Sequence, residues 1–335
     1  MRTRALLMRR WRSIVGFLVG VLLVVAAALV LAQNHDSFVE SLRAVAASPP
    51  WLIAIMLVLP VGNALIVSWS FQTLMRRFGS VPFADMFWLI CSAWLLNYLP
   101  MRPGLVGRLA YHKAVHRVAI KDSVAVSVAL ALMTGLAAAH LLLCWLAFMP
   151  GATLGVATLV VTTVGVFVIA NIAADRSPAG RVPRSALRAS LVLRYVDLAI
   201  WAARMWVAFE MIGHPIPVMV SVLLAAAIQL AYLFPLTGSG LGVAEWSIGL
   251  VAVWAVGTGL EGGLDTSHGI TATLISRSAE LVSAVPLGLV AAGVLARHRI
   301  RAARTRRLQN ASDPSPSPEE PGSGPEQADS VPPPG

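Results

Sequence analysis

Charged side chains placed inside long apolar stretches are the first candidates for chemistry in this sequence. They are Arg194, Asp197, Arg204, Arg277 and Glu280. On helices, Asp197 and Arg204 share a face because they are seven residues apart, and Arg277 can pair directly with Glu280 three residues on. A charge at membrane depth is costly and by default marks a functional site, although ion pairs can also lock helices together. We predict that Asp197, Arg204, Arg277 and Glu280 form a polar path.

A second candidate is the segment 97–108, where two arginines flank a break in an apolar stretch. Pro100 and Pro103 interrupt a helix because proline lacks a backbone donor and clashes with the preceding turn. The planar guanidinium groups of Arg102 and Arg108 suit a phosphate or carboxylate. Alternatively, both arginines reach lipid headgroups from the membrane edge. The substrate-binding candidates in this segment are Asn97, Arg102, Gly104 and Arg108.

A third candidate is the glycine-rich segment 237–242, which opens an apolar stretch containing Glu245. Glycines allow an anionic group to approach the backbone, and a helix N-terminus presents free N–H groups. A tight hairpin tip can have the same composition, so the segment is a candidate mainly because its position matches that of the first break. Its substrate-binding candidates are Thr237, Gly238, Gly240, Gly242 and Glu245.

The composition sets the class of protein around these candidates. Hydrophobic residues make up 57% of the 335-residue chain and charged residues 13%, about half the usual charged share. The net charge of +10 comes from basic residues at the ends of apolar stretches, which indicates membrane orientation and no nucleic-acid partner. His112 and His116 lack a nearby carboxylate for a metal, and no nucleotide, dinucleotide or hydrolase motif appears, so we expect no cofactor.

We predict an all-α integral membrane protein with six full transmembrane helices and two re-entrant helical hairpins. The spans are 14–32, 51–74, 123–148, 153–173, 190–212 and 270–295, and the hairpins join 83–99 to 105–120 and 218–234 to 241–256. The re-entrant hairpins keep every basic cluster on the cytoplasmic side, as the positive-inside rule requires. Those clusters are 2–12, 76–77, 102–121, 176–188 and 297–307.

The order of these elements predicts an inverted repeat with halves 14–148 and 153–296. Interrupted helices at matching positions of two halves mark the binding site in transporters of that type. A basic N-terminus, 1–13, precedes the first span, which we interpret as uncleaved, a signal peptide being the alternative. Beyond 297 a basic stretch leads into a tail, 309–335, whose composition predicts disorder.

The two breaks carry a family resemblance. Asn97-x-Leu99-Pro100-x-Arg102-x-Gly104-x-x-x-Arg108 and Pro235-x-Thr237-Gly238-x-Gly240-Leu241-Gly242-x-x-Glu245, together with Arg277, resemble the flippase-like membrane domain of lysylphosphatidylglycerol synthetases, including its stand-alone forms. The resemblance implies that a lipid or a lipid-linked headgroup is moved across a bacterial plasma membrane. The soluble aminoacyl-transfer domain has no counterpart, so we expect no enzyme activity.

This chain departs from the family pattern in both breaks. Leu105 stands where the family often has an acidic residue, and Gly238-Ser239-Gly240 stands where it often has Pro-Gly-Gly. The leading hypothesis is a lipid flippase-like transporter of the bacterial plasma membrane, with both termini cytoplasmic and membrane lipids as partners. The alternatives are an accessory subunit of a cell-envelope glycosyltransferase or lipid-modifying enzyme, and a small transferase acting on lipid-linked substrates.

Overall fold

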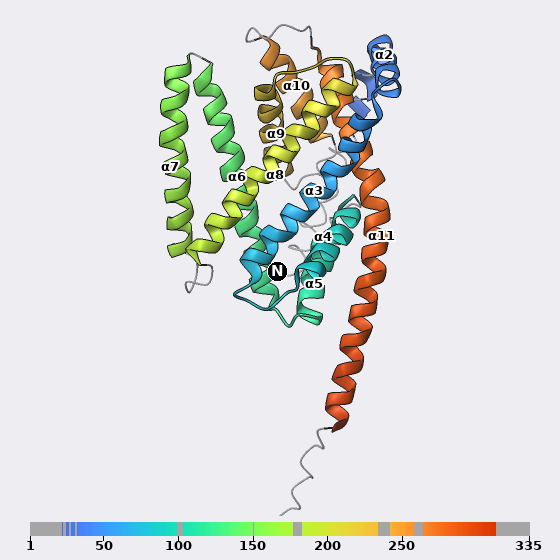
Figure 1. Cartoon of the computed structure of the whole chain (residues 1–335), viewed down its shortest axis with the longest axis vertical. Helices are drawn as coiled ribbons and strands as arrows, with labels where there is room; N and C mark the ends of the chain where they lie inside the picture. Colours follow the sequence, from blue (N-terminus) through green and yellow to red (C-terminus); the bar gives the residue numbers. More distant parts are fainter. Residues whose placement is uncertain are drawn as a thin grey trace, which may run out of the picture. The chain divides into compact units, whose positions relative to one another are not determined.

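The computed structural model describes residues 22, 25–26, 28–30, 32–98, 103–149, 151–176, 183–233, 242–257 and 264–312, and within them every regular element is a helix (Figure 1). The helices are α2 (His35–Ala46), α3 (Pro50–Met75), α4 (Phe83–Asn97), α5 (Pro103–Ala114), α6 (Ile120–Phe148), α7 (Ala152–Arg176), α8 (Arg184–Met211), α9 (Val218–Leu233), α10 (Val243–Gly257) and α11 (Thr266–Ser312). The predicted first span, 14–32, lies mostly outside the described residues.

Four helices are long and apolar enough to cross a membrane. They are α3, α6, the Thr153–Ile172 part of α7 and the Thr266–His298 part of α11. The large apolar side chains of Val160, Val161 and Val164 on α7 are exposed, as a lipid-facing surface requires. With 28 residues, α8 is about 42 Å long, but it carries six charged residues. The predicted helical membrane class agrees with these features.

Two pairs of shorter helices lie between the long ones. The helix α4 packs against α5, and α9 packs against α10. These helices have 12 to 16 residues and are therefore about 18–24 Å long, less than the roughly 30 Å hydrocarbon core. A Cβ atom on Gly104 would collide with the carbonyl oxygen of Ala93, so this glycine allows α4 and α5 to approach closely.

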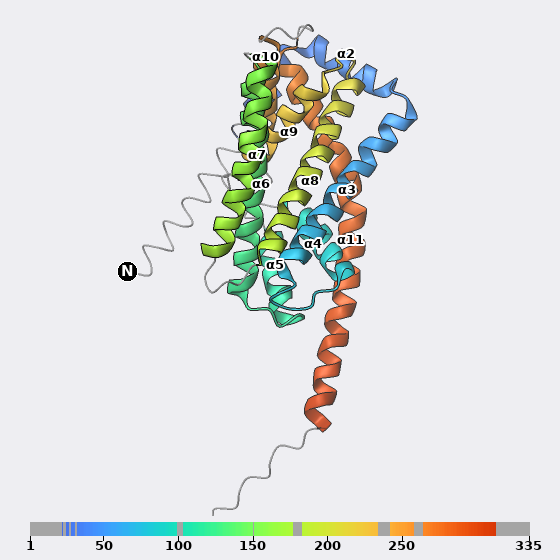
Figure 2. The same cartoon turned by 60° about the vertical axis from the view of Figure 1, so that its left-hand side comes forward.

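Packing of the long helices around α8 positions the polar residues. α8 lies along α3 and also contacts α6, α7 and α9, and both views show α6 beside α7 (Figures 1 and 2). At the contact between α10 and α11, a Cβ atom on Gly269 would lie 2.6 Å from the Cα atom of Gly249. Small residues thus let these helices approach closely, as is common in membrane bundles.

The chain divides into two compact units, 1–295 and 296–335. The first unit contains α2 to α10 and the part of α11 up to Leu295. In the second unit α11 continues to Ser312, so the first four residues of the tail predicted to be disordered are helical. Residues 313–335 lie outside the described part of the chain.

Candidate functional site

Three charged side chains of α8 are buried in the interior of the first unit. Arg194, Asp197 and Arg204 are 3%, 2% and 1% exposed. The Arg194 Nη1 atom donates to Oδ2 of Asp197 over 3.2 Å, and its Nη2 atom donates to Oγ of Ser70 on α3 over 2.7 Å. A buried guanidinium needs both a counter-charge and hydrogen-bond acceptors, and here two helices supply them.

The carboxylate of Asp197 accepts hydrogen bonds from three helices. Besides Arg194 of its own helix, Asn63 of α3 donates through Nδ2 to Oδ1 over 2.8 Å, and Gln229 of α9 donates through Nε2 to Oδ2 over 3.2 Å. The amide oxygen of Asn63 in turn accepts from Arg204 Nη1 over 3.3 Å. Asn63 therefore connects Asp197 with Arg204, the two residues predicted to share a face of this helix.

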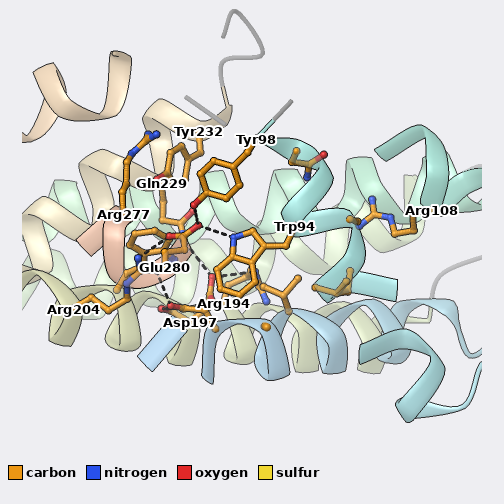
Figure 3. A pocket seen from close by; sticks show the side chains of 17 residues that line it. Trp94, Tyr98, Arg108, Arg194, Asp197, Arg204, Gln229, Tyr232, Arg277 and Glu280 are labelled. Carbon is orange, nitrogen blue, oxygen red and sulfur yellow. Dashed lines mark hydrogen bonds and ion pairs between the residues drawn. The ribbon is translucent and has the colours of Figure 1, made fainter. Parts of the chain in front are cut away.

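The carboxylate of Glu280 on α11 is the second centre of the network (Figure 3). Arg204 Nη2 lies 2.7 Å from its Oε2 atom, while Trp94 Nε1 and the Tyr98 hydroxyl donate to Oε1 over 2.6 and 2.8 Å. Arg204 also donates to the hydroxyl and carbonyl of Ser276 and stacks 3.9 Å above the ring of Trp201. Glu280 thus joins α4, α8 and α11.

Arg277 is paired with a residue of a different helix. Its Nε atom lies 2.8 Å from Oε1 of Glu245 on α10, and the backbone N–H of Gly242 donates to Oε2 of Glu245 over 2.7 Å. The sequence placed Arg277 and Glu280 within reach of each other, but each has its ion-pair partner on a neighbouring helix. This is because α11 is flanked by α10 and α8, which present an opposite charge to each of them.

These side chains surround a cavity of about 300 Å³. Of the residues predicted to form the site, the cavity is lined by Asn97, Arg108, Asp197, Arg204, Arg277 and Glu280. They come from the segment of the first break and from both charged helices, so segments far apart in the sequence meet at one place. The aromatic side chains of Trp94, Tyr98, Trp201 and Tyr232 form much of the remaining wall.

Arg108 differs from the other three arginines of the cavity. Arg194, Arg204 and Arg277 each pair with a carboxylate. Arg108 donates to the Ser127 hydroxyl over 2.9 Å and lies 3.9 Å above the ring of Phe71, and no carboxylate of the described residues pairs with it. Figure 3 shows Arg108 apart from the ion-pair network. The cavity therefore contains one positive charge without a described counter-charge.

The remaining site predictions have different outcomes. Gly104 serves the close contact of α4 with α5. Glu245 pairs with Arg277, and the Gly242 backbone N–H donates to Glu245. The other four predicted residues, Arg102, Thr237, Gly238 and Gly240, lie outside the described residues.

Several cavity residues were not predicted from the sequence. Asn63 and Gln229 are amides inside otherwise apolar helices, which was an available signal for buried polar partners. Trp94 and Tyr232 carry no such signal, because aromatic residues are common throughout apolar helices. Within the described residues, no group of three or more histidine, cysteine or acidic side chains is arranged to hold a metal ion.

Comparisons with known proteins do not identify a family. No protein-family model matches the sequence, and no curated protein matches it. The resemblance to the flippase-like domain of lysylphosphatidylglycerol synthetases therefore stays a prediction. The function is inferred below from the chemistry of the cavity.

Proposed function

We propose that the protein is a flippase-like transporter that moves a lipid with an anionic, phosphate-bearing headgroup across the bacterial plasma membrane. The observation that carries this proposal is Arg108, a cavity-lining arginine without a carboxylate partner among the described residues. A guanidinium binds a phosphate through two parallel N–H groups. A phosphate beside Arg108 would provide the counter-charge that the described residues do not.

The proposed topology has six full spans and two re-entrant pairs, α4–α5 and α9–α10, in an inverted repeat with both termini cytoplasmic. The shortness of these four helices supports it, because each is shorter than the hydrocarbon core. Both pairs also reach the polar interior. Asn97 and Arg108 of the first pair and Gln229 of the second line the cavity. Paired interrupted segments around a central site are the arrangement expected of an inverted-repeat transporter.

The paired arginines supply the second part of the mechanism. Arg204 and Arg277 are already held by Glu280 and Glu245, so an anion entering the cavity competes with carboxylates for them. Such competition permits release, since a site that only attracts the headgroup would retain it. The acyl chains would stay in the bilayer beside the exposed apolar surface while the headgroup passes through the polar interior.

The proposal is tested by lipid exchange in proteoliposomes with the variant Arg108→Gln. Glutamine retains a donor for Ser127 but removes the charge, so exchange of fluorescent phosphatidylglycerol between leaflets should slow about tenfold or more, the value of a charge-assisted hydrogen bond. The matched control is Arg188→Gln, because Arg188 is exposed and donates to Asn171 outside the cavity. An unchanged rate in Arg108→Gln would remove this arginine from the mechanism, and no exchange by the unsubstituted protein would contradict transport.

One observation favours the alternative of an accessory subunit for a cell-envelope glycosyltransferase or lipid-modifying enzyme. Three of the four cavity arginines pair with carboxylates of the protein, as in a network that locks helices together. A scaffold of this kind would co-purify with its enzyme and would tolerate Arg108→Gln without loss of function. Affinity purification from native membranes tests whether an enzyme co-purifies with the protein. Measuring function in the Arg108→Gln variant then distinguishes a scaffold from a transporter.

A further inference from the structure

The interface between α5 and α6 continues the polar lining of the cavity. The two helices are joined by a short connection and pack against each other, so they run antiparallel. The hydrogen bond from Arg108 to Ser127 fixes their register. His112 lies one turn further along α5, and Ser123 lies one turn back along α6, on the faces that carry Arg108 and Ser127. His112 and Ser123 therefore lie between the cavity-lining Arg108 and the connection that joins α5 to α6.

Both side chains are buried and lack hydrogen bonds. His112 is 1% exposed and Ser123 is 2% exposed. Neither ring nitrogen of His112 nor the hydroxyl of Ser123 has a partner among the described residues. The two neighbouring hydroxyls on α6 behave differently, since Ser127 and Thr134 each donate to the carbonyl four residues before them. Burying unpaired polar groups costs free energy, so adjacent unpaired groups indicate a place that water or a polar ligand occupies.

The surface at the end of this interface beyond His112 is basic. Lys113, Arg117 and Lys121, at the end of α5, in the connection and at the start of α6, are all exposed. An anionic headgroup arriving from the surface would first meet these charges and then the buried histidine and serine. Arg108 follows at the wall of the cavity. Groups able to bind a phosphate thus succeed one another from the surface to the interior.

We propose that Arg108, His112, Ser123 and Ser127 line a hydrophilic passage between α5 and α6, through which a phosphate-bearing headgroup moves between the basic surface and the cavity. The passage rests on the proposed transport function, which by itself does not say where a headgroup enters. His112 and Ser123 each offer a donor and an acceptor that can bind a phosphate oxygen or the water that it displaces. The ion-pair network remains the central site.

Thiol labelling in sealed vesicles tests the passage without measuring transport. The variant Ser123→Cys is compared with Ser221→Cys, since Ser221 is also the fourth residue of its helix and is 1% exposed, but its hydroxyl is satisfied by the Val218 carbonyl. A sulfonate-bearing methanethiosulfonate reacts with hydrated thiolate. It should modify Ser123→Cys at least about tenfold faster than Ser221→Cys, because thiolate forms only where water reaches it. The native buried thiols, Cys91 and Cys144, give the background rate.

The charge of the reagent provides the second measurement. With Arg108 on the passage, the sulfonate reagent should react with Ser123→Cys faster than a trimethylammonium reagent does, and adding Arg108→Gln should reduce this difference. Inorganic phosphate should slow the labelling of Ser123→Cys. Equal labelling of Ser123→Cys and Ser221→Cys would overturn the passage even if lipid exchange depends on Arg108. Fast labelling of Ser123→Cys in a protein that exchanges no lipid would support a hydrated path but contradict the movement of a headgroup through it.

Discussion

Nη2 of Arg204 lies 2.7 Å from Oε2 of Glu280, and this ion pair joins α8 to α11 in the interior of the protein. The two residues are 76 positions apart, and both are at least nine-tenths buried. A buried pair gains Coulomb energy but loses the hydration of both charges, so its net contribution to stability is small, whereas breaking it is costly.

Replacement of Glu280 by alanine should therefore strongly destabilise the protein. It leaves Arg204 buried with one charge unpaired and also removes the acceptor of Trp94 and Tyr98. The expected loss is about 3–5 kcal/mol of unfolding free energy. It is measured as a lower thermal midpoint in detergent. The double variant Arg204→Met/Glu280→Leu should recover most of the loss, since no charge then stays unpaired. A double variant as unstable as Glu280→Ala would show that the interior charges do not compensate each other.

Gly104 and Gly107 provide a matched pair on one helix. A Cβ atom on Gly104 would collide with the Ala93 carbonyl, whereas one on Gly107 would meet nothing within 4 Å. We expect Gly104→Ala to cost about 1–3 kcal/mol as an overpacked contact. Gly107→Ala should be neutral or stabilise α5 by up to about 1 kcal/mol, the helix propensity difference. Thermal midpoints of the two variants test this, and equal midpoints would contradict the close α4–α5 contact.

The class of fold could be predicted from the sequence because the length of an apolar stretch is a local property of the chain. The stretches at 51–74 and 123–148 correspond to α3 and α6 within a few residues. Helix ends were less predictable: α8 begins at Arg184, within a segment assigned to a cytoplasmic basic cluster. A basic first turn is helical here because arginine is a good helix former, and the extended N-cap residue Pro183 sets the start of the helix.

The members of the site were more predictable than their pairings. Asp197 and Arg204 stood out as charges in an apolar helix, and both are buried and line the cavity. Asn63 connects them although it is 134 residues from Asp197 and 141 residues from Arg204 in the sequence. Which neighbouring helix presents a counter-charge depends on tertiary packing, so Glu245 could not be assigned to Arg277 from spacing along one helix.

Acid should weaken the start of α11 through Asp265. Burial raises the pKa of the Asp265 carboxyl, but hydrogen bonds from the Ser267 hydroxyl and the His268 backbone N–H outweigh burial and hold this pKa below its ordinary value. A depressed pKa contributes stability above the unfolded pKa of about 4, and this contribution is lost as the pH falls through the folded pKa. Thermal midpoints measured from pH 6 downward should thus decline less steeply in Asp265→Asn than in the unsubstituted protein. Parallel declines would show that this carboxylate does not stabilise the helix start.

Filling the α5–α6 passage with apolar side chains should slow lipid transport without lowering the stability of the protein. In His112→Leu/Ser123→Ala, the buried polar atoms that lack partners are removed, so their desolvation cost disappears. The thermal midpoint should stay equal or rise, while lipid exchange in proteoliposomes should fall about tenfold or more, since a hydrated route no longer reaches Arg108. If these two residues had a structural role instead, the midpoint would fall. Any loss of lipid exchange would then follow from the loss of folded protein. The control Ser221→Ala removes a hydroxyl that its own helix already satisfies, and it should leave exchange unchanged.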